Sequence, residues 1–416
     1  QVQNHLVTGL AASRDRYGAV SSPLYYFRAW YSKDGSTFYA LPNMATAYAN
    51  VPDAPTESAV VNSDGNLLMQ LDGVSVPGSY AGPLAARDAA GDIYMLFKPS
   101  QIAYSASDLG VALKKYAPSG TPLWTRYYHG AQAASYYPKA ITLDASGNVF
   151  IACDVTSANS DIWLSKLDQN GNQLWTKTYN GASNGTDSVN ALAADAAGNV
   201  YAAGSVQVSA QTDMLVLKYA PDGSGPAAAT YAGPDGLNDA ATAIDIGADG
   251  RVYVAGTSVV PTNTSHTKMV FLKYDASLAL SNASAFGTWA SDPLITDYVG
   301  QYFTSGQDGD DYPYALKVST WGALYAAGYV YDTGYHEKDA WVGKIDGSGV
   351  LVSTNVSFVY YADDMFSSLA LSTTTGELFG AGYQMYPSPT LWFQKISTNG
   401  LSFMWNKKFL YSALST

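Results

Sequence analysis

Seven copies of one short motif, 51 to 72 residues apart, predict an all-β fold, a seven-bladed β-propeller of four-stranded antiparallel blades. Repeats of about this length are typical of propellers and solenoids. Asn-Gly, Asp-Gly and Ser-Gly turns separate short apolar stretches, and no stretch has helical periodicity, so each unit is expected to be an antiparallel sheet. Seven such units can close into a ring.

The motif that anchors each copy is Gly-x-x-aromatic at the start of an apolar stretch. The glycines are Gly35, Gly91, Gly147, Gly198, Gly250, Gly322 and Gly376, and the aromatics are Phe38, Tyr94, Phe150, Tyr201, Tyr253, Tyr325 and Phe379. The aromatic has a fixed phase on this stretch and alternates with smaller residues. We therefore expect it to be buried between neighbouring blades, on the second strand of each.

Three further strands complete each unit. An Ala- and Asp-rich stretch such as DSVNALAAD from Asp187 precedes the anchor, and its small residues suit the crowded axis of a ring. After the anchor comes an apolar stretch ending in a Lys-hydrophobe turn, such as SKLDQNG up to Gly171, and then a last strand with Trp175 in this copy. The interval between Gly250 and Gly322 is longer than the others, so it carries an insertion.

The stretch WTKTYNGASNGTDSVNALAADAAGNVYAAG from Trp175 to Gly204 resembles the SBBP-type family of bacterial β-propeller repeats, which are NHL-like in shape. The resemblance is strongest in the middle copies and extends from about Tyr25 to the C-terminus. It implies an exported or cell-surface protein and a fold that has no fixed activity. The expected organisation is an N-terminal extension at 1–20 and a propeller at 21–416, with an insertion at about 280–310.

Composition excludes several kinds of partner. The formal net charge is −12, which disfavours binding to nucleic acid. No run of apolar residues is long enough to span a membrane, and the single cysteine, Cys153, allows no internal disulfide. We expect Cys153 to be a packed structural thiol. The first residue is Gln1, which fits a mature exported chain whose signal peptide has been removed.

Aspartates recur about eleven residues before the anchor, at Asp187, Asp239, Asp311 and, one residue out of register, Asp364. If they converge on one rim of the ring, they could bind cations or hydroxyl-rich ligands. The favoured interpretation is structural: each carboxylate closes the loop that leads into its blade, since a residue that recurs in every repeat usually serves the repeat.

The insertion departs from the repeat, and function often lies on such loops. Its candidate binding residues are Trp289, Tyr298, Tyr302, Phe303, Asp308, Asp310 and Asp311. Aromatics combined with carboxylates suit a protein contact, a glycan or calcium, although a long hairpin that packs on the blades is an equal alternative. The sequence DGDD lacks the spacing of a calcium loop, so no cofactor is predicted and calcium stays an alternative.

No catalytic grouping stands out in the sequence. Ser183 lies in a Gly-x-Ser-x-Gly pattern, but a loop between strands is the wrong context for a nucleophile. The favoured function is therefore a non-enzymatic, secreted or cell-surface scaffold that contacts a protein partner or assembles with itself. The alternatives are a carbohydrate- or peptide-binding propeller and, last, an axial-site lyase or hydrolase.

Overall fold

The structure is a computed structural model. It describes residues 30–32, 38–40, 58–61, 67–71, 85–98, 110–129, 134–233, 236–260, 266–280, 310–332, 337–346, 351–357, 363–372, 375–384 and 390–410. Every helix or strand assigned within these ranges is a β-strand. The part of the chain that the structure describes contains no helix with the length and hydrophobicity needed to cross a membrane.

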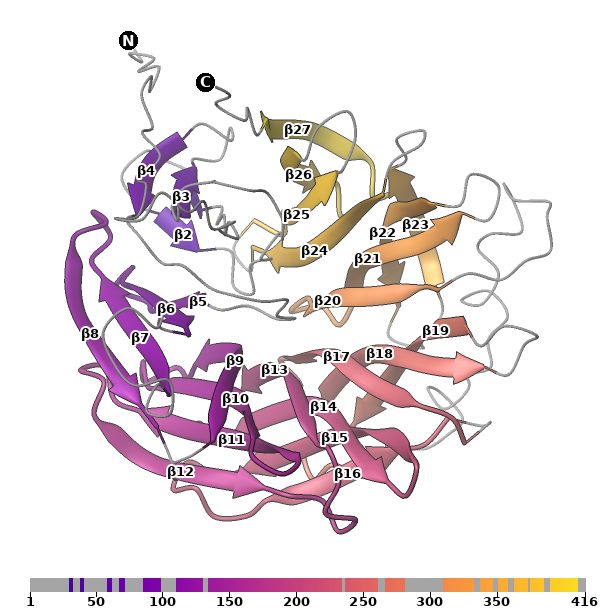
Figure 1. Ribbon diagram of the computed structural model, residues 1–416. Helices are drawn as coiled ribbons and strands as arrows, with labels where there is room; N and C mark the ends of the chain where they lie inside the picture. Colours follow the sequence, from indigo (N-terminus) through magenta and orange to yellow (C-terminus); the bar gives the residue numbers. More distant parts are fainter. Residues whose placement is uncertain are drawn as a thin grey trace, which may run out of the picture.

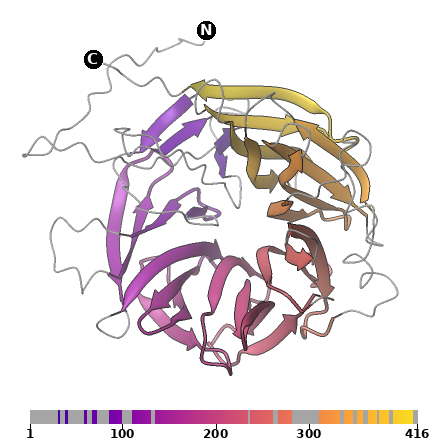
Figure 2. The same ribbon diagram turned by 45° about the vertical axis from the view of Figure 1, so that its right-hand side comes forward.

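Six antiparallel sheets make up most of the described chain. Five of them have four strands and one has three, and the strands of each sheet are paired in chain order. The sheets follow one another around a common centre (Figure 2). Two hairpins precede them in sequence, β1 (Trp30–Ser32) with β2 (Phe38–Ala40) and β3 (Ser58–Val61) with β4 (Leu67–Leu71), and lie between the last sheet and the first (Figure 1).

Each sheet runs from the centre outward. The first strands surround the centre (Figure 1): β5 (Ala85–Arg87), β9 (Ser135–Leu143), β13 (Ser188–Ala194), β17 (Asp239–Ile246), β20 (Tyr312–Val318) and β24 (Asp364–Leu371). The second strands are β6 (Ile93–Phe97), β10 (Val149–Thr156), β14 (Val200–Val208), β18 (Val252–Val260), β21 (Leu324–Asp332) and β25 (Leu378–Gln384). The third strands are β7 (Val111–Tyr116), β11 (Ser160–Leu167), β15 (Gln211–Tyr219), β19 (His266–Tyr274), β22 (Glu337–Ile345) and β26 (Thr390–Ile396). The fourth strands are β8 (Pro122–Tyr128), β12 (Gln173–Tyr179), β16 (Ala227–Tyr231), β23 (Leu351–Ser357) and β27 (Phe403–Leu410).

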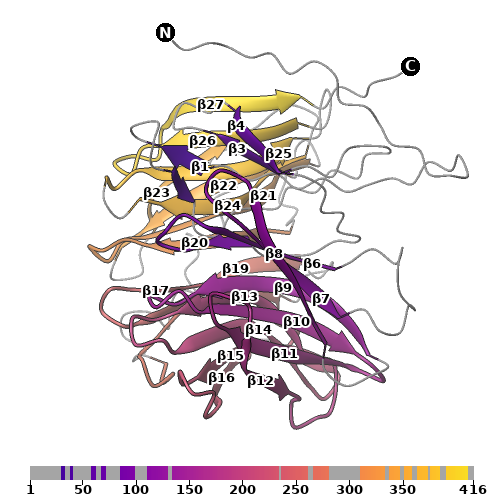
Figure 3. The same ribbon diagram turned by 90° about the vertical axis from the view of Figure 1, so that its left-hand side faces the viewer.

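The first strands also hold neighbouring sheets together. Each packs against the first strand of the next sheet, from β5 through β9, β13, β17 and β20 to β24. The fourth strands β12, β16 and β27 lie at the periphery (Figure 3). The all-β, antiparallel prediction is therefore confirmed.

The turn between the first and second strands explains the anchor glycine. Gly198 has a φ of 83°, a left-handed conformation that glycine adopts without steric cost. Oδ1 of Asp195 accepts hydrogen bonds from the backbone N–H groups of Ala197 and Asn199, at 3.0 and 2.9 Å. The Asp-x-x-Gly-Asn sequence thus closes its own turn.

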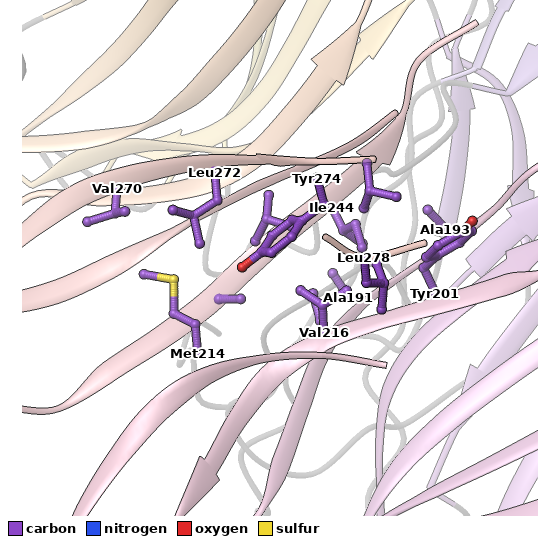
Figure 4. Close-up of a cluster of buried hydrophobic side chains, with 14 residues drawn as sticks. Ala191, Ala193, Tyr201, Met214, Val216, Ile244, Val270, Leu272, Tyr274 and Leu278 are labelled. Atoms are coloured by element: carbon purple, nitrogen blue, oxygen red, sulfur yellow. The ribbon is translucent and has the colours of Figure 1, made fainter. Parts of the chain in front are cut away.

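Five of the anchor aromatics, Tyr94, Phe150, Tyr201, Tyr253 and Tyr325, lie in buried clusters that join neighbouring sheets, as predicted. The anchor side chains are described in six copies and are buried in all of them: Tyr94, Phe150, Tyr201, Tyr253, Tyr325 and Phe379. Tyr201 shares a buried cluster with Ile244, Leu272 and Tyr274 of the following sheet (Figure 4). Burial of such large rings adds apolar contact area between neighbouring sheets.

A lysine on the third strand adds a polar bond across the same boundary. Nζ of Lys166 lies 5.0 Å from the ring centroid of Phe150 and donates to the carbonyl oxygen of Pro221, in the next sheet, at 3.1 Å. Equivalent lysines bond in the same way: Lys115 to Gln169, Lys218 to Ala276 and Lys344 to Thr398. The lysine of the second motif therefore ties one sheet to the next, a role that sequence analysis did not assign.

Candidate functional site

The first strands carry a β-bulge at the same place in five sheets. The residue left out of the pairing register is Lys139 in β9, Asn190 in β13, Thr242 in β17, Tyr314 in β20 and Ser367 in β24. Bulges re-aim side chains and are over-represented next to active sites. Because these strands surround the centre of the fold, the five bulged residues are candidates for a functional site.

The last glycine of the anchor motif, Gly204 on β14, pairs with Val189 next to the bulge, where the backbones come close together. A Cβ on Gly204 would lie 1.9 Å from the carbonyl oxygen of Ser188, so a side chain cannot fit there. Cys153 takes this place in β10, opposite Pro138. Cys153 is fully buried, and burial raises the pKa of its thiol. The predicted burial of the Cys153 thiol is thus confirmed.

Two of the bulged residues bond the neighbouring sheet. Nδ2 of Asn190 donates to the carbonyl oxygen of Ala241 at 2.8 Å. Oγ1 of Thr242 donates to the carbonyl oxygen of Pro313. These uncharged side chains therefore hold adjacent first strands together.

Lys139 differs from them because it brings a charge. Its Nζ lies 3.1 Å from Oδ2 of Asp154 on β10, and 3.4 Å from Oγ of Ser188 on β13. Asp154 also accepts hydrogen bonds from Oγ of Ser188 at 2.7 Å and from the backbone N–H of Val189 at 2.9 Å. The carboxylate thus fixes the ammonium group at the boundary between two sheets.

An exposed tyrosine lies beside this ion pair. Tyr137 precedes Lys139 by two residues on β9, pairs with Asp154 in the strand register and is 36% exposed. Nζ of Lys98, which follows β6, lies 3.9 Å from the centroid of the Tyr137 ring. We call Lys98, Tyr137, Lys139 and Asp154 the Lys–Tyr site.

The Lys–Tyr site combines groups that can bind and process an anionic ligand. Ammonium groups attract carboxylate and sulfate groups and form charge-assisted hydrogen bonds with them. A tyrosine hydroxyl can accept or donate a proton and can act in general acid–base catalysis. The arrangement therefore suits a reaction in which a proton moves next to a carboxylate.

A cluster of tyrosines occupies the equivalent place in the β20–β23 sheet. Ring centroids are 4.5 Å apart for Tyr312 and Tyr314, and 5.9 Å apart for Tyr314 and Tyr329. Nζ of Lys338 lies 4.7 Å from the centroid of Tyr329. Burial, reinforced by the nearby Asp310, raises the pKa of Tyr329, so its hydroxyl stays protonated at neutral pH. We call Tyr312, Tyr314 and Tyr329 the tyrosine cluster.

The recurring aspartates have structural bonds. All four are buried: Asp187, Asp239, Asp311 and Asp364. The carboxylate of Asp187 accepts hydrogen bonds from the backbone N–H groups of Gly181 and, at 3.0 Å, Gln207. That of Asp239 accepts one from Gly233 at 2.5 Å. In both sheets the bond closes the loop that leads into the first strand, as the favoured interpretation expects, while a role in ligand binding stays a prediction.

The structure also brings Asp364 into register with the others. Asp364 and Asp239 each lie three residues before the bulged residue of their strand. The additional residue lies in the following turn, where Gly376 donates to the carbonyl oxygen of Ser372, four residues earlier, whereas Gly250 donates to Gly247, three earlier. The shift seen in the sequence is therefore a longer turn.

Two carboxylates that precede these aspartates tie sheets together. Oδ1 of Asp310, which is exposed, accepts a hydrogen bond from the backbone N–H of Thr267 at 2.8 Å. Oδ1 of Asp363 accepts the corresponding bond from Lys338 at 3.0 Å. Both bonds join a third strand to the loop before the next first strand.

The other candidate residues of the insertion, Trp289, Tyr298, Tyr302, Phe303 and Asp308, lie outside the described residues. Their binding role stays a prediction. Within the described ranges, no group of three or more His, Cys, Asp or Glu side chains is placed to hold a metal ion. Calcium binding is likewise untested.

Sequence analysis missed the Lys–Tyr site because none of its residues is part of the motif that recurs in the repeats. Where β13, β17, β20 and β24 have a recurring aspartate three residues before the bulge, β9 has Tyr136. Lys139 is the only charged residue among the five bulged positions. This loss of the aspartate together with the gain of a lysine is a signal that could have identified the site.

Comparisons with known proteins found similarity to solved structures but none to family models or curated proteins. A solved structure described as "Polysaccharide lyase PL25-Ulvanlyase bound to GlcA(1-4)Rha3S" is similar over 92% of this chain and 94% of its own, with a TM-score of 0.53 and 10% identity. A second, "polysaccharide lyase Uly1", is similar over 81% of this chain and 85% of its own, with a TM-score of 0.48 and 11% identity.

The first similarity corrects the functional prediction. A non-enzymatic scaffold or assembly subunit was favoured because the fold implied no activity and no catalytic grouping was visible. A chain with a similar fold over nearly its whole length is an enzyme, a polysaccharide lyase. The predictions of a scaffold and of a protein that is no enzyme are therefore wrong, and the predicted protein partner gains no support from these findings.

Proposed function

We propose that the chain is a seven-bladed β-propeller that cleaves an anionic polysaccharide as a lyase, with its chemistry at the Lys–Tyr site. The observation that carries the proposal is the contact of Lys98 with the exposed Tyr137, on a first strand that also carries Lys139 in its ion pair with Asp154, in a fold that resembles a polysaccharide lyase. The likeness alone concerns the fold, so the function is argued from the site.

Seven blades would explain both the seven anchor motifs of the sequence and the six sheets with two hairpins of the structure. Six anchor aromatics lie in the six sheets, and the seventh, Phe38, lies in β2. The hairpins β1–β2 and β3–β4 lie between the last and the first of the six sheets, where a seventh blade would close the ring (Figure 1). In this proposal 21–416 form the propeller and 1–20 are an N-terminal extension.

The chemistry is a β-elimination at a uronic acid. The base takes the proton from C5, the electron pair of that C–H bond forms the C4–C5 double bond, and the C4–O bond breaks. The released oxygen then takes up a proton, so no water is consumed. The proton on C5 becomes acidic enough only if the negative charge that develops on the neighbouring carboxylate is stabilised.

The Lys–Tyr site provides both functions. Lys98 and Lys139 would bind the uronate carboxylate and stabilise the developing charge. The Tyr137 oxygen would accept the C5 proton and return it to the leaving oxygen. Asp154 would act as a positioning residue, since its ion pair holds Lys139 in place.

An anionic polysaccharide fits the charge of the site. The chain as a whole is acidic, with a net charge of −12, so a polyanion would need a local cationic group to bind. The structurally similar ulvan lyase is bound to a glycan with uronic acid and sulfated rhamnose, and we extend this substrate class to the present chain. An exported location follows from the proposal, because polysaccharides are degraded outside the cell that takes up the fragments.

The test is an assay of the purified chain with a panel of sulfated and unsulfated polyuronates. A lyase produces the C4–C5 double bond, which absorbs in the ultraviolet and identifies the product. Tyr137→Phe keeps the ring and its contact with Lys98 but removes the hydroxyl, so it should lower kcat by at least about a hundredfold. Tyr127→Phe is the matched control, because Tyr127 is 66% exposed on the peripheral strand β8.

Saturated fragments would indicate hydrolysis and would contradict the lyase assignment. Binding of a polysaccharide without any cleavage would favour the second candidate, a carbohydrate-binding propeller. Full activity of Tyr137→Phe would exclude Tyr137 as the group that moves the proton.

A further inference from the structure

This inference rests on the proposed function. We propose that Tyr314, supported by Tyr312 and Tyr329, binds a second sugar ring of the same polysaccharide chain, at a distance from the Lys–Tyr site. The tyrosine cluster would thus set the length of substrate that the protein prefers, and it would take no part in the chemistry.

The two sites occupy equivalent positions on different first strands. Lys139 of β9 and Tyr314 of β20 are both bulged residues, and Tyr137 and Tyr312 both precede the bulge by two residues. The first strands β9, β13, β17 and β20 pack side by side in this order, so the two sites lie on the same series of adjacent strands. In this proposal a polysaccharide that crosses β13 and β17 contacts both sites.

Only small side chains separate the two sites on the strands between them. The two equivalent positions are Ser188 and Asn190 on β13, and Ala240 and Thr242 on β17. Asn190 and Thr242 are also held against the neighbouring sheet by their hydrogen bonds to Ala241 and Pro313. The side chains on this path are thus short, and large polar aromatics occur at its two ends.

The tyrosine cluster has the chemistry that a sugar ring needs. Tyr312 and Tyr314 are both partly exposed, whereas Tyr329 is buried and its ring contacts both of theirs. An aromatic face packs against the C–H groups of a pyranose, and a phenol hydroxyl bonds its hydroxyl groups. Lys338, over the ring of Tyr329, adds a positive charge that suits a sulfated or uronic residue.

A polysaccharide long enough to contact both sites should bind more tightly than a short fragment that contacts one. Linking two weak contacts through one chain makes the second contact intramolecular and raises the apparent affinity. The preference for long substrate should disappear when Tyr314 loses its aromatic face.

The experiment measures KM for the polysaccharide and for the shortest fragment that is cleaved, in wild type and in Tyr314→Ala. Because one aromatic contact is lost, we expect KM for the polysaccharide to rise about tenfold. KM for the short fragment should rise much less. Tyr314→Leu keeps most of the volume without an aromatic face and should behave in the same way, so a folding defect of Tyr314→Ala can be recognised. Tyr127→Ala should match wild type.

Retardation in native gels that contain the polysaccharide measures binding without cleavage. If wild type is retarded but forms no unsaturated product, the lyase proposal fails, and weaker retardation of Tyr314→Ala still supports this inference. If wild type cleaves the polysaccharide while Tyr314→Ala and Tyr314→Leu keep its KM and retardation, this inference is overturned and the lyase proposal stands. A wild-type chain that neither binds nor cleaves any polysaccharide of the panel overturns both.

Discussion

Asp154 and Lys139 form an ion pair across the first two strands of one sheet, with 3.1 Å between Oδ2 and Nζ, and both side chains are mostly buried. The same carboxylate accepts hydrogen bonds from Ser188 and Val189 of the next sheet. A single aspartate therefore holds the ammonium group of the Lys–Tyr site and joins two sheets. Its position on β10 links the stability of the fold to the geometry of the site.

Replacing Asp154 should therefore cost more stability than replacing an exposed ion-pair partner. Asp154→Ala leaves Lys139 without its counter-ion and removes an acceptor from two donors of β13, so we expect the free energy of unfolding to fall by about 2–3 kcal/mol. Asp249→Ala is the control, since Asp249 pairs with Arg251 at the surface, and it should cost at most about 1 kcal/mol. Urea unfolding gives both values, and equal losses would show that the buried pair has no special role.

The anchor aromatics should dominate the stability of the sheet boundaries. Tyr201→Ala removes a fully buried ring from the cluster between the third and fourth sheets, so we expect a loss of about 3–5 kcal/mol. Tyr127→Ala removes an exposed ring and should change stability by no more than about 0.5 kcal/mol. A thermal unfolding curve of Tyr201→Ala that matches wild type would mean that the ring does not pack as described.

Cys153 should react slowly with thiol reagents in the native protein. Its side chain is fully buried, and burial raises the pKa of the thiol, so the reactive thiolate is scarce in the folded state. Labelling should follow the rate of unfolding and should become fast in denaturant. Rapid labelling under native conditions would contradict the packing of this residue against its cluster.

Stability should fall in strongly alkaline solution because buried tyrosines resist ionisation. Burial raises the pKa of Tyr219 and of Tyr383 from the ordinary value of 10.0 to about 12. Below pH 10 folded and unfolded chains both retain these protons, so stability is unaffected. Above about pH 10 the unfolded chain releases protons that the folded chain keeps, and the free energy of unfolding falls until about pH 12.

Thermal unfolding midpoints measured from about pH 8 to about pH 12, together with the absorbance of ionised tyrosine, test this dependence. The midpoint should begin to fall near pH 10, and the absorbance of the buried rings should appear only as the chain unfolds. Ionisation of all tyrosines near pH 10 with the fold intact would rule out the burial that we describe.

The periodic part of the fold could be predicted from the sequence because each repeat satisfies its own local requirements. The side chain of Asp195 accepts the hydrogen bonds that close its own turn at Gly198, and the ring of Tyr201 packs in an apolar cluster. The lysine ties could not be predicted in this way, because Lys166 bonds Pro221 across 55 residues of sequence. Such a bond depends on how neighbouring sheets are placed, which no local pattern encodes.

The Lys–Tyr site shows the same limit more strongly. Lys98 follows β6 of one sheet and Tyr137 lies on β9 of the next, so no spacing in the sequence connects them. The bulge that leaves Lys139 out of register is also a property of strand pairing. Sequence analysis looked for function in the insertion, where the repeat is interrupted, whereas this site arises from single substitutions within a regular copy.

The most direct test of the account is the mass of the fragments that the purified chain releases from a defined anionic oligosaccharide. If the chain is a lyase, the masses of the two fragments add up to the mass of the substrate, and one fragment carries the double bond. Tyr137→Phe should abolish these fragments while Tyr127→Phe leaves them unchanged. Fragments that together exceed the substrate by one water, or equal cleavage by Tyr137→Phe, would contradict the central claim.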